Sequence, residues 1–296
     1  MSNPYKTREG GATVTVFVPY DCNNHCPFCI NKPEYANCAD FSLARILESI
    51  ETLDAITPQC DFVFTGGEPF ANLESLQTML DKIPPTHKVY INTTFPVQDD
   101  KYTAQQMLDF VERNREKITC INISRHLVKY VEESDDEIIA RIATPKRVNC
   151  VLYMDYPKEQ LTGYAERWRK YGIPIQFRYD YTETTPENLY DEESDRILCD
   201  LKEAFTYRGL DGCRMRNGFH FSYKDLHLTY HKTLPYSTIV ETDSDGVTYD
   251  ILYDVLIKQN GDIHSDWTGV KMDVDKYRRV VFEPYDLRVI DGAIEF

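Results

Sequence analysis

The sequence lacks any apolar run long enough to cross a bilayer. None of its 296 residues belong to an uninterrupted hydrophobic segment approaching the roughly 20 residues that a membrane-spanning helix needs. The polar start M-S-N-P-Y-K-T-R has no apolar core of signal-peptide length. The nine cysteines are an odd number, unlike the paired framework of a secreted disulfide protein. We therefore expect a cytoplasmic protein without a membrane segment.

Positive charge is also scarce. The chain has 33 Lys and Arg against 48 Asp and Glu, a formal net charge of −15, and residues 183–296 hold 13 of the former and 23 of the latter. Nucleic acids are bound mainly through cations that neutralise phosphates, and anionic membrane surfaces attract the same residues, so both partners are disfavoured. The acidic second part either attracts a cationic small molecule or peptide or keeps the protein soluble.

Three cysteines stand close together without a fourth. Cys22, Cys26 and Cys29 lie in the run D-C-N-N-H-C-P-F-C, directly after an apolar stretch. A [4Fe-4S] cluster is normally held by four thiolates, one per iron, and structural zinc needs a closed set of four ligands. Three thiolates would leave one iron open to a substrate or cofactor, whereas a zinc site could be completed by His25 or Cys38.

A second motif follows about forty residues later. The strand-like run D-F-V-F-T ends in Gly66, Gly67, Glu68 and Pro69. Paired glycines let a ligand approach the backbone closely, and the Glu68 carboxylate is a partner for an ammonium group. The alternative is a plain Gly-Gly turn before a helix that begins at proline.

The cysteine spacing, the aromatic Phe28 before the last cysteine and the G-G-E-P element together resemble the radical S-adenosylmethionine (radical SAM) family. The resemblance implies that the three cysteines ligate a [4Fe-4S] cluster and that Phe28 and residues 66–69 bind S-adenosylmethionine (SAM). It further implies that reductive cleavage of SAM gives a 5′-deoxyadenosyl radical, which abstracts hydrogen from a small molecule or peptide, and that flavodoxin or ferredoxin supplies the electron. The alternative function is a zinc-stabilised binding module without redox chemistry.

Strand-like and helix-like segments alternate through the first two-thirds of the chain, as in a parallel α/β sheet. The six expected strands are 13–20, 61–65, 88–95, 119–124, 147–154 and 173–181. This count fits the partial (β/α)6 barrel that the resemblance implies, over residues 1–182. Ligands of parallel sheets bind beyond the carboxyl ends of strands, and both motifs directly follow strands.

Polar residues near the ends of later strands are further candidates for SAM contacts. Asn92 lies near the end of the third strand, and Ser124 and Asn149 resemble family positions on the fourth and fifth strands. For each of them the alternative is a structural role, in which the polar side chain only forms hydrogen bonds with the backbone at the end of its strand.

Residues 183–296 are predicted to form an acidic connector, one helix and a β-rich appendage that covers the substrate. Only Cys199 and Cys213 follow residue 150, too few for a second cluster, so we expect a single-cluster enzyme. Cys213 lies in the glycine-flanked run G-L-D-G-C-R-M-R-N-G, and a thiol could return a hydrogen atom to a substrate radical. Epimerisation or rearrangement is therefore the favoured reaction, and an incidental cysteine is the alternative.

Overall fold

The computed structural model describes most of the chain. The described residues are 3–19, 22, 24, 26–29, 39–57, 59–97, 101–131, 133–180, 185, 188–189, 191–213, 216–233, 239–265, 267, 269–273, 281–283 and 288–291. Only the backbone is described for Glu9, Cys213, Arg216, 282–283 and 288–291.

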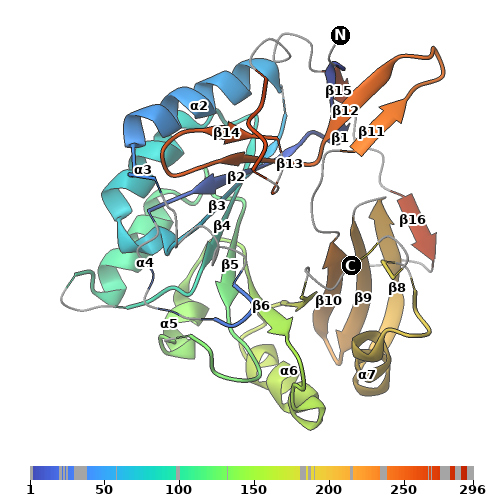
Figure 1. Ribbon diagram of the computed structural model, residues 1–296. Helices are drawn as coiled ribbons and strands as arrows, with labels where there is room; N and C mark the ends of the chain where they lie inside the picture. The colour runs from blue at the N-terminus through green and yellow to red at the C-terminus, as the bar shows by residue number, and fades with distance from the viewer. Residues whose placement is uncertain are drawn as a thin grey trace.

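One large sheet organises the molecule (Figure 1). Its twelve strands run in the order β14-β13-β2-β3-β4-β5-β6-β7-β10-β9-β8-β16. The neighbours from β13 to β10 all pair in parallel. The strands of this parallel part are β13 (Asp254–Ile257), β2 (Thr13–Phe17), β3 (Asp61–Thr65), β4 (Lys88–Thr93), β5 (Cys120–Ser124), β6 (Lys146–Leu152), β7 (Ile175–Tyr179) and β10 (Leu226–Thr233). The antiparallel margins are β14 (Ile263–His264), β9 (Arg216–Tyr223), β8 (Thr206–Cys213) and β16 (Arg288–Asp291).

Helices follow most strands of the core and lie along one side of the sheet (Figure 1). They are α2 (Leu43–Ile56), α3 (Leu73–Lys82), α4 (Ala104–Arg113), α5 (Asp136–Arg141) and α6 (Leu161–Arg169), with short 3₁₀ turns at Pro69–Ala71 and Lys158–Gln160. Local sequence sets their starts: Thr103, the N-cap of α4, forms a complete capping box with Gln106. Helix α7 (Arg196–Ala204) precedes β8.

The two faces of the sheet differ in polarity because side chains alternate along each strand. Phe177 of β7 packs against Tyr164 of α6, with ring centroids 6.1 Å apart, and Phe62, Phe64 and Cys150 are fully buried in the same core. The opposite face, which we call the inner face, carries the polar residues of the strands. The fold therefore presents a polar surface away from helices α2 to α6.

The expected architecture is confirmed as a mixed α/β fold with a large parallel sheet and a β-rich C-terminal region. The six core strands correspond to β2 to β7, and a turn at Asn260-Gly261 joins the antiparallel strands β13 and β14. The C-terminal strands β10 and β13 extend the core sheet at β7 and at β2. The proposed boundary between residues 182 and 183 stays a prediction.

A second sheet was not expected from the sequence. It has the order β11-β12-β1-β15 and combines β1 (Tyr5–Glu9) with β11 (Ile239–Thr242), β12 (Thr248–Leu252) and β15 (Val281–Glu283). Strand β1 is thus paired with residues more than 240 positions away in the chain.

Candidate active site

The two motifs meet at the carboxyl ends of β2 and β3. The Val18 N–H donates to the Thr65 carbonyl oxygen at 2.8 Å, and Gly66 follows with a φ of +108°. A Cβ at Gly66 would lie 2.9 Å from the Val18 oxygen, closer than real Cβ contacts. Glycine is therefore required there both by conformation and by space, and it lets the G-G-E-P segment lie against the chain entering the cysteine loop.

The three candidate cluster ligands are half-buried. The Cys29 N–H donates to the Cys26 carbonyl oxygen at 3.2 Å, which closes a turn. Burial raises the pKa of the Cys22 thiol above its ordinary value, and the nearby negative charges of Glu68 and Cys29 act in the same direction against a hydrogen bond from the Asn24 backbone. Cys22 therefore shares an electrostatic environment with Cys29 and with the second motif.

The donor set fits a [4Fe-4S] cluster with one open iron. Among the residues that the structure describes, no three His, Cys, Asp or Glu side chains are placed to hold one metal ion together. A cubane does not require such a group, because each cysteine binds a different iron. His25 and Cys38, the predicted fourth ligands of the zinc alternative, lie outside the described residues.

Glu68 is buried and accepts four hydrogen bonds from its own chain. Its Oε1 accepts from the Phe70 N–H at 3.0 Å and from the Thr93 hydroxyl. Its Oε2 accepts from the Thr94 N–H at 2.8 Å and from the Thr94 hydroxyl at 2.9 Å. Burial raises the pKa of this carboxyl group, while the four donors oppose the rise.

These four bonds fill the usual acceptor positions of a carboxylate. The side chain thus joins the end of β3 to the end of β4, and Pro69 begins the 3₁₀ turn that it caps. An ammonium group would have to displace one of these donors or bind the neighbouring backbone carbonyl oxygens instead.

Phe28 sits among three aromatic rings. Its ring centroid lies 4.8 Å from that of His126, 5.4 Å from Tyr130 and 5.7 Å from Tyr153. Burial, together with the charge of Arg125, lowers the pKa of His126 to about 4, so His126 is neutral at pH 7. These contacts fix the third cysteine of the loop against the segments that follow β5 and β6.

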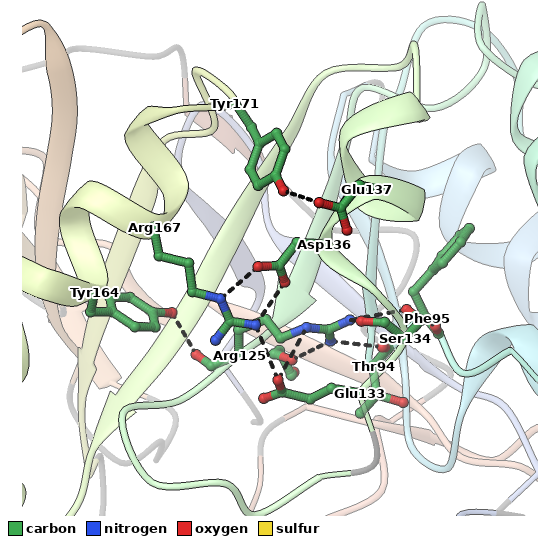
Figure 2. Close-up of polar contacts among 11 residues, drawn as sticks. Thr94, Phe95, Arg125, Glu133, Ser134, Asp136, Glu137, Tyr164, Arg167 and Tyr171 are labelled. Carbon is green, nitrogen blue, oxygen red and sulfur yellow. Dashed lines mark hydrogen bonds and ion pairs between the residues drawn. The ribbon is translucent and has the colours of Figure 1, made fainter.

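A buried arginine organises the segment after β5 (Figure 2). Arg125 has no exposed surface and donates from Nη1 to the carbonyl oxygens of Thr94 at 2.9 Å and of Ser124 at 2.8 Å. Its Nη2 donates to the Ser134 carbonyl and hydroxyl oxygens at 3.2 and 3.0 Å. Glu133 approaches its Nε at 3.9 Å.

Arg167 continues this network from helix α6. It donates to both carboxylate oxygens of Asp136, at 2.7 and 2.6 Å, and to Glu133 at 3.3 Å. Sequence reasoning did not identify Arg125 or His126 as site residues. The available signal was their place directly after Ser124, at the carboxyl end of a core strand.

The predicted strand-end residues share the inner face. The Asn122 amide of β5 donates to the Asn92 oxygen at 2.7 Å and accepts from Arg147 Nε at 2.6 Å. Ser124 and Asn149 are Cα partners on β5 and β6. Cys213 ends β8 opposite Arg216, but its side chain lies outside what the structure describes, so its predicted role stays a prediction.

A cavity of about 510 Å³ opens beside the cysteine loop, within the range of small-ligand sites. Phe28, Cys29, Tyr153 and Tyr179 line it, and the ion pair of Lys232 with Asp195 closes another side. This pair has a separation of 3.0 Å and side chains that are only 3% exposed. The cavity therefore combines aromatic surfaces with paired charge at the carboxyl ends of β6, β7 and β10.

Comparison with known proteins supports the [4Fe-4S] cluster and the fold. Residues 9–123 match the family model of a 4Fe-4S single cluster domain. This match covers the cysteine loop and the G-G-E-P segment, and it supports the [4Fe-4S] cluster rather than the zinc alternative. No curated protein matches the chain.

The fold resembles that of SuiB from Streptococcus suis. The structure of SuiB bound to the precursor peptide SuiA is 12% identical, covers 90% of this chain and 64% of that chain, and gives a TM-score of 0.56. SuiB bound to S-adenosylmethionine is 14% identical over 88% and 62%, with a TM-score of 0.53. A structure of anSMEcpe with bound AdoMet is 16% identical and covers 62% of this chain and 54% of that chain, with a TM-score of 0.41.

This chain spans less than two thirds of the length of each of these solved structures. The domain match supports the [4Fe-4S] cluster that the motifs indicated, and the likeness to SuiB supports the fold. Within the described part of the chain, none of the helices combines the length and apolar character that a bilayer crossing needs.

Proposed function

We propose that the chain is a radical SAM enzyme that uses one [4Fe-4S] cluster to start hydrogen abstraction from a peptide or small molecule. The observation that carries the proposal is the meeting of the two motifs: Gly66 lies against Val18, four residues before Cys22. Segments that are far apart in the sequence thus build one edge of the inner face.

Each protein group has a distinct task in this proposal. Cys22, Cys26 and Cys29 would hold three irons, and the fourth would chelate SAM, whose reductive cleavage supplies a 5′-deoxyadenosyl radical. Glu68 is a positioning residue, because its four hydrogen bonds fix the backbone of residues 66–70 and of Thr94. Backbone carbonyl oxygens of this segment would then receive the methionyl ammonium group.

The cavity beside Cys29 is suited to the adenosyl end of SAM. Its aromatic residues Phe28, Tyr153 and Tyr179 offer surfaces for a planar base. Asn92, Ser124 and Asn149 lie on the inner face, where polar groups can meet the ribose and the methionyl carboxylate. The cofactor would therefore extend from the cavity across the ends of β4, β5 and β6.

The substrate and the final step are finer proposals. SuiB has been solved with a precursor peptide, and we extend a peptide substrate to this chain, with a small molecule as the other class. Cys213 would return a hydrogen atom in an epimerisation, or the cofactor would return it in a rearrangement. A flavodoxin or ferredoxin would supply the electron. The zinc-stabilised binding module is not favoured, because the domain match is to a [4Fe-4S] domain.

The test is anaerobic reconstitution with iron and sulfide, followed by addition of a reductant and SAM. We expect about four irons per chain, broad iron–thiolate absorption and formation of 5′-deoxyadenosine. Zinc binding with neither iron uptake nor SAM cleavage would overturn the proposal. Once a substrate is known, Cys213→Ala should still form 5′-deoxyadenosine but fail to incorporate solvent deuterium into the product.

A further inference from the structure

A row of polar residues crosses the inner face at one level of the sheet. Ser124 of β5 is the Cα partner of Asn149 on β6, and Asn149 is the partner of Gln176 on β7. Gln176 in turn pairs with Thr229 of β10, and Thr229 pairs with His220 of β9. Because partners in register project to the same face, these five residues lie side by side on five consecutive strands.

Two oxygen atoms in the middle of this row have no hydrogen-bond partner among the described residues. They are Oδ1 of Asn149 and Oε1 of Gln176, and both are buried. Gln176 as a whole is only 2% exposed. An unsatisfied buried acceptor costs about 1 to 3 kcal/mol, so a buried oxygen without a protein partner calls for a bound group that donates to it, either water or a ligand.

The surroundings of the two oxygens favour a neutral ligand group. Ser124 and Thr229, the flanking members of the row, carry no charge, and the one titratable member, His220, lies 3.3 Å from the Asp211 carboxylate. Arg147 and Arg178 stand two residues away on β6 and β7, on the same face, and their positive charge disfavours an ammonium donor. Neighbouring strands are about 4.8 Å apart, so side chains on β6 and β7 can converge on two donors of one ligand. Carboxamide oxygens accept hydrogen bonds from hydroxyl or amide groups.

We propose that Asn149 and Gln176 form a ligand site that accepts a pair of hydrogen bonds from neutral donors. The donors come either from the ribose hydroxyls of SAM or from the amide N–H groups of a peptide substrate, and this assignment rests on the function proposed above. Gln176 is the residue that this proposal adds to the site. Its strand, β7, lies between β5 and β6, where the cofactor is proposed to bind, and the strands β10 and β9.

The proposal predicts how a substitution at Gln176 changes the thermal stability of the ligand-free protein. If Gln176 serves a ligand, Gln176→Met removes an unpaired buried oxygen at nearly constant shape. The unfolding midpoint of the ligand-free protein should therefore stay the same or rise. If Gln176 were only structural, the midpoint would fall. Gln176→Glu keeps an acceptor oxygen and should retain most ligand affinity, and Gln160→Leu changes an exposed glutamine as a matched control.

The first arm of the experiment measures SAM and its 2′-deoxy analogue by calorimetry on reconstituted protein. If the ribose is the donor, wild type should prefer SAM to the analogue by about tenfold, the loss of one hydrogen bond to a buried partner. Gln176→Met should lose that preference, while Gln160→Leu keeps it.

The second arm uses N-acetyl-trialanine amide and its ester analogue, in which oxygen replaces a backbone N–H. If the substrate is the donor, wild type should bind the amide about tenfold more tightly than the ester, and Gln176→Met should bind both alike. The proposal is overturned if neither preference depends on Gln176, or if Gln176→Met lowers the unfolding midpoint.

The two arms separate this site from the function as a whole. If the wild-type protein cleaves SAM but Gln176→Met keeps the wild-type binding preference in both arms, the ligand site is refuted and the enzyme assignment stays intact. A protein that holds no cluster and binds no SAM removes the enzyme assignment, and the peptide arm still decides whether Gln176 binds a ligand.

Discussion

Arg125 donates a hydrogen bond of 2.9 Å to the backbone carbonyl oxygen of Thr94. The same Thr94 gives its N–H and its hydroxyl to the Glu68 carboxylate. One residue therefore links the G-G-E-P segment after β3 to the arginine that follows β5. The link makes the geometry at the end of one strand depend on a cation two strands away.

Replacement of Cys26 should abolish cluster binding. Cys26→Ala removes one of three thiolates in the loop, and iron bound to two thiolates is exposed to loss. We expect iron content after anaerobic reconstitution to fall to near zero, measured by colorimetric iron assay. Cys199→Ala, which changes an exposed cysteine, should retain the wild-type iron content. Full iron and continued SAM cleavage in Cys26→Ala would refute the ligand assignment.

Glu68→Ala should weaken both the fold and the cofactor site. Four donors lose their acceptor, and we expect a loss of about 2 to 4 kcal/mol in the free energy of unfolding. SAM affinity should fall by roughly tenfold or more, because residues 66–70 are no longer held. Urea unfolding and calorimetry measure the two effects. Glu74→Ala, at an exposed position of α3, should change neither.

Two glycines should respond to alanine in opposite directions. Gly66→Ala places a Cβ 2.9 Å from the Val18 oxygen at a φ of +108°, so we expect the free energy of unfolding to fall by about 2 kcal/mol or more. Gly163→Ala lies in α6 with nothing within 4 Å of the new Cβ and should raise it by about 0.5 to 1 kcal/mol. Equal effects at both positions would contradict the close approach at Gly66.

Stability should fall on mild acidification because of His126. Its pKa is lowered from 6.5 to about 4, so between these values the unfolded state binds the proton and the folded state does not. The stabilisation is complete above pH 6.5 and is lost as the pH falls toward 4. From pH 7 to pH 5 the free energy of unfolding should drop by about 2 kcal/mol more in wild type than in His126→Gln. Parallel urea titrations at the two pH values compare them, and identical pH dependence would exclude this assignment.

The sequence was sufficient to predict the elements and motifs that a short run of residues specifies. The strands β2 to β7 are short runs of β-branched and aromatic residues, and the cysteine loop and G-G-E-P segment follow the first two of them. Residues that follow successive parallel strands must gather at one edge, which is why Val18 and Gly66 could be expected near each other.

The remaining features depend on pairings that no local pattern specifies. Strand β1 pairs with β12, far along the chain, and the residues of neither strand indicate which strand is its partner. Arg125 reads in sequence as an ordinary charged residue after a strand, and its burial follows only from the positions of Thr94 and Ser134. Gln176 could be placed on the inner face by alternation alone, whereas the unpaired state of its oxygen required the structure.

The core sheet acquires its outermost parallel strands from segments that follow all six core strands in the sequence. Strand β13 covers the open side of β2, and β10 covers that of β7. A nascent chain that has emerged only as far as residue 182 would expose two rows of unpaired backbone groups, which invite intermolecular pairing. During synthesis β7 and β2 therefore stay open at their outer edges until β10 and then β13 have left the ribosome, so the parallel part of the sheet closes on both sides only after residue 257 has emerged.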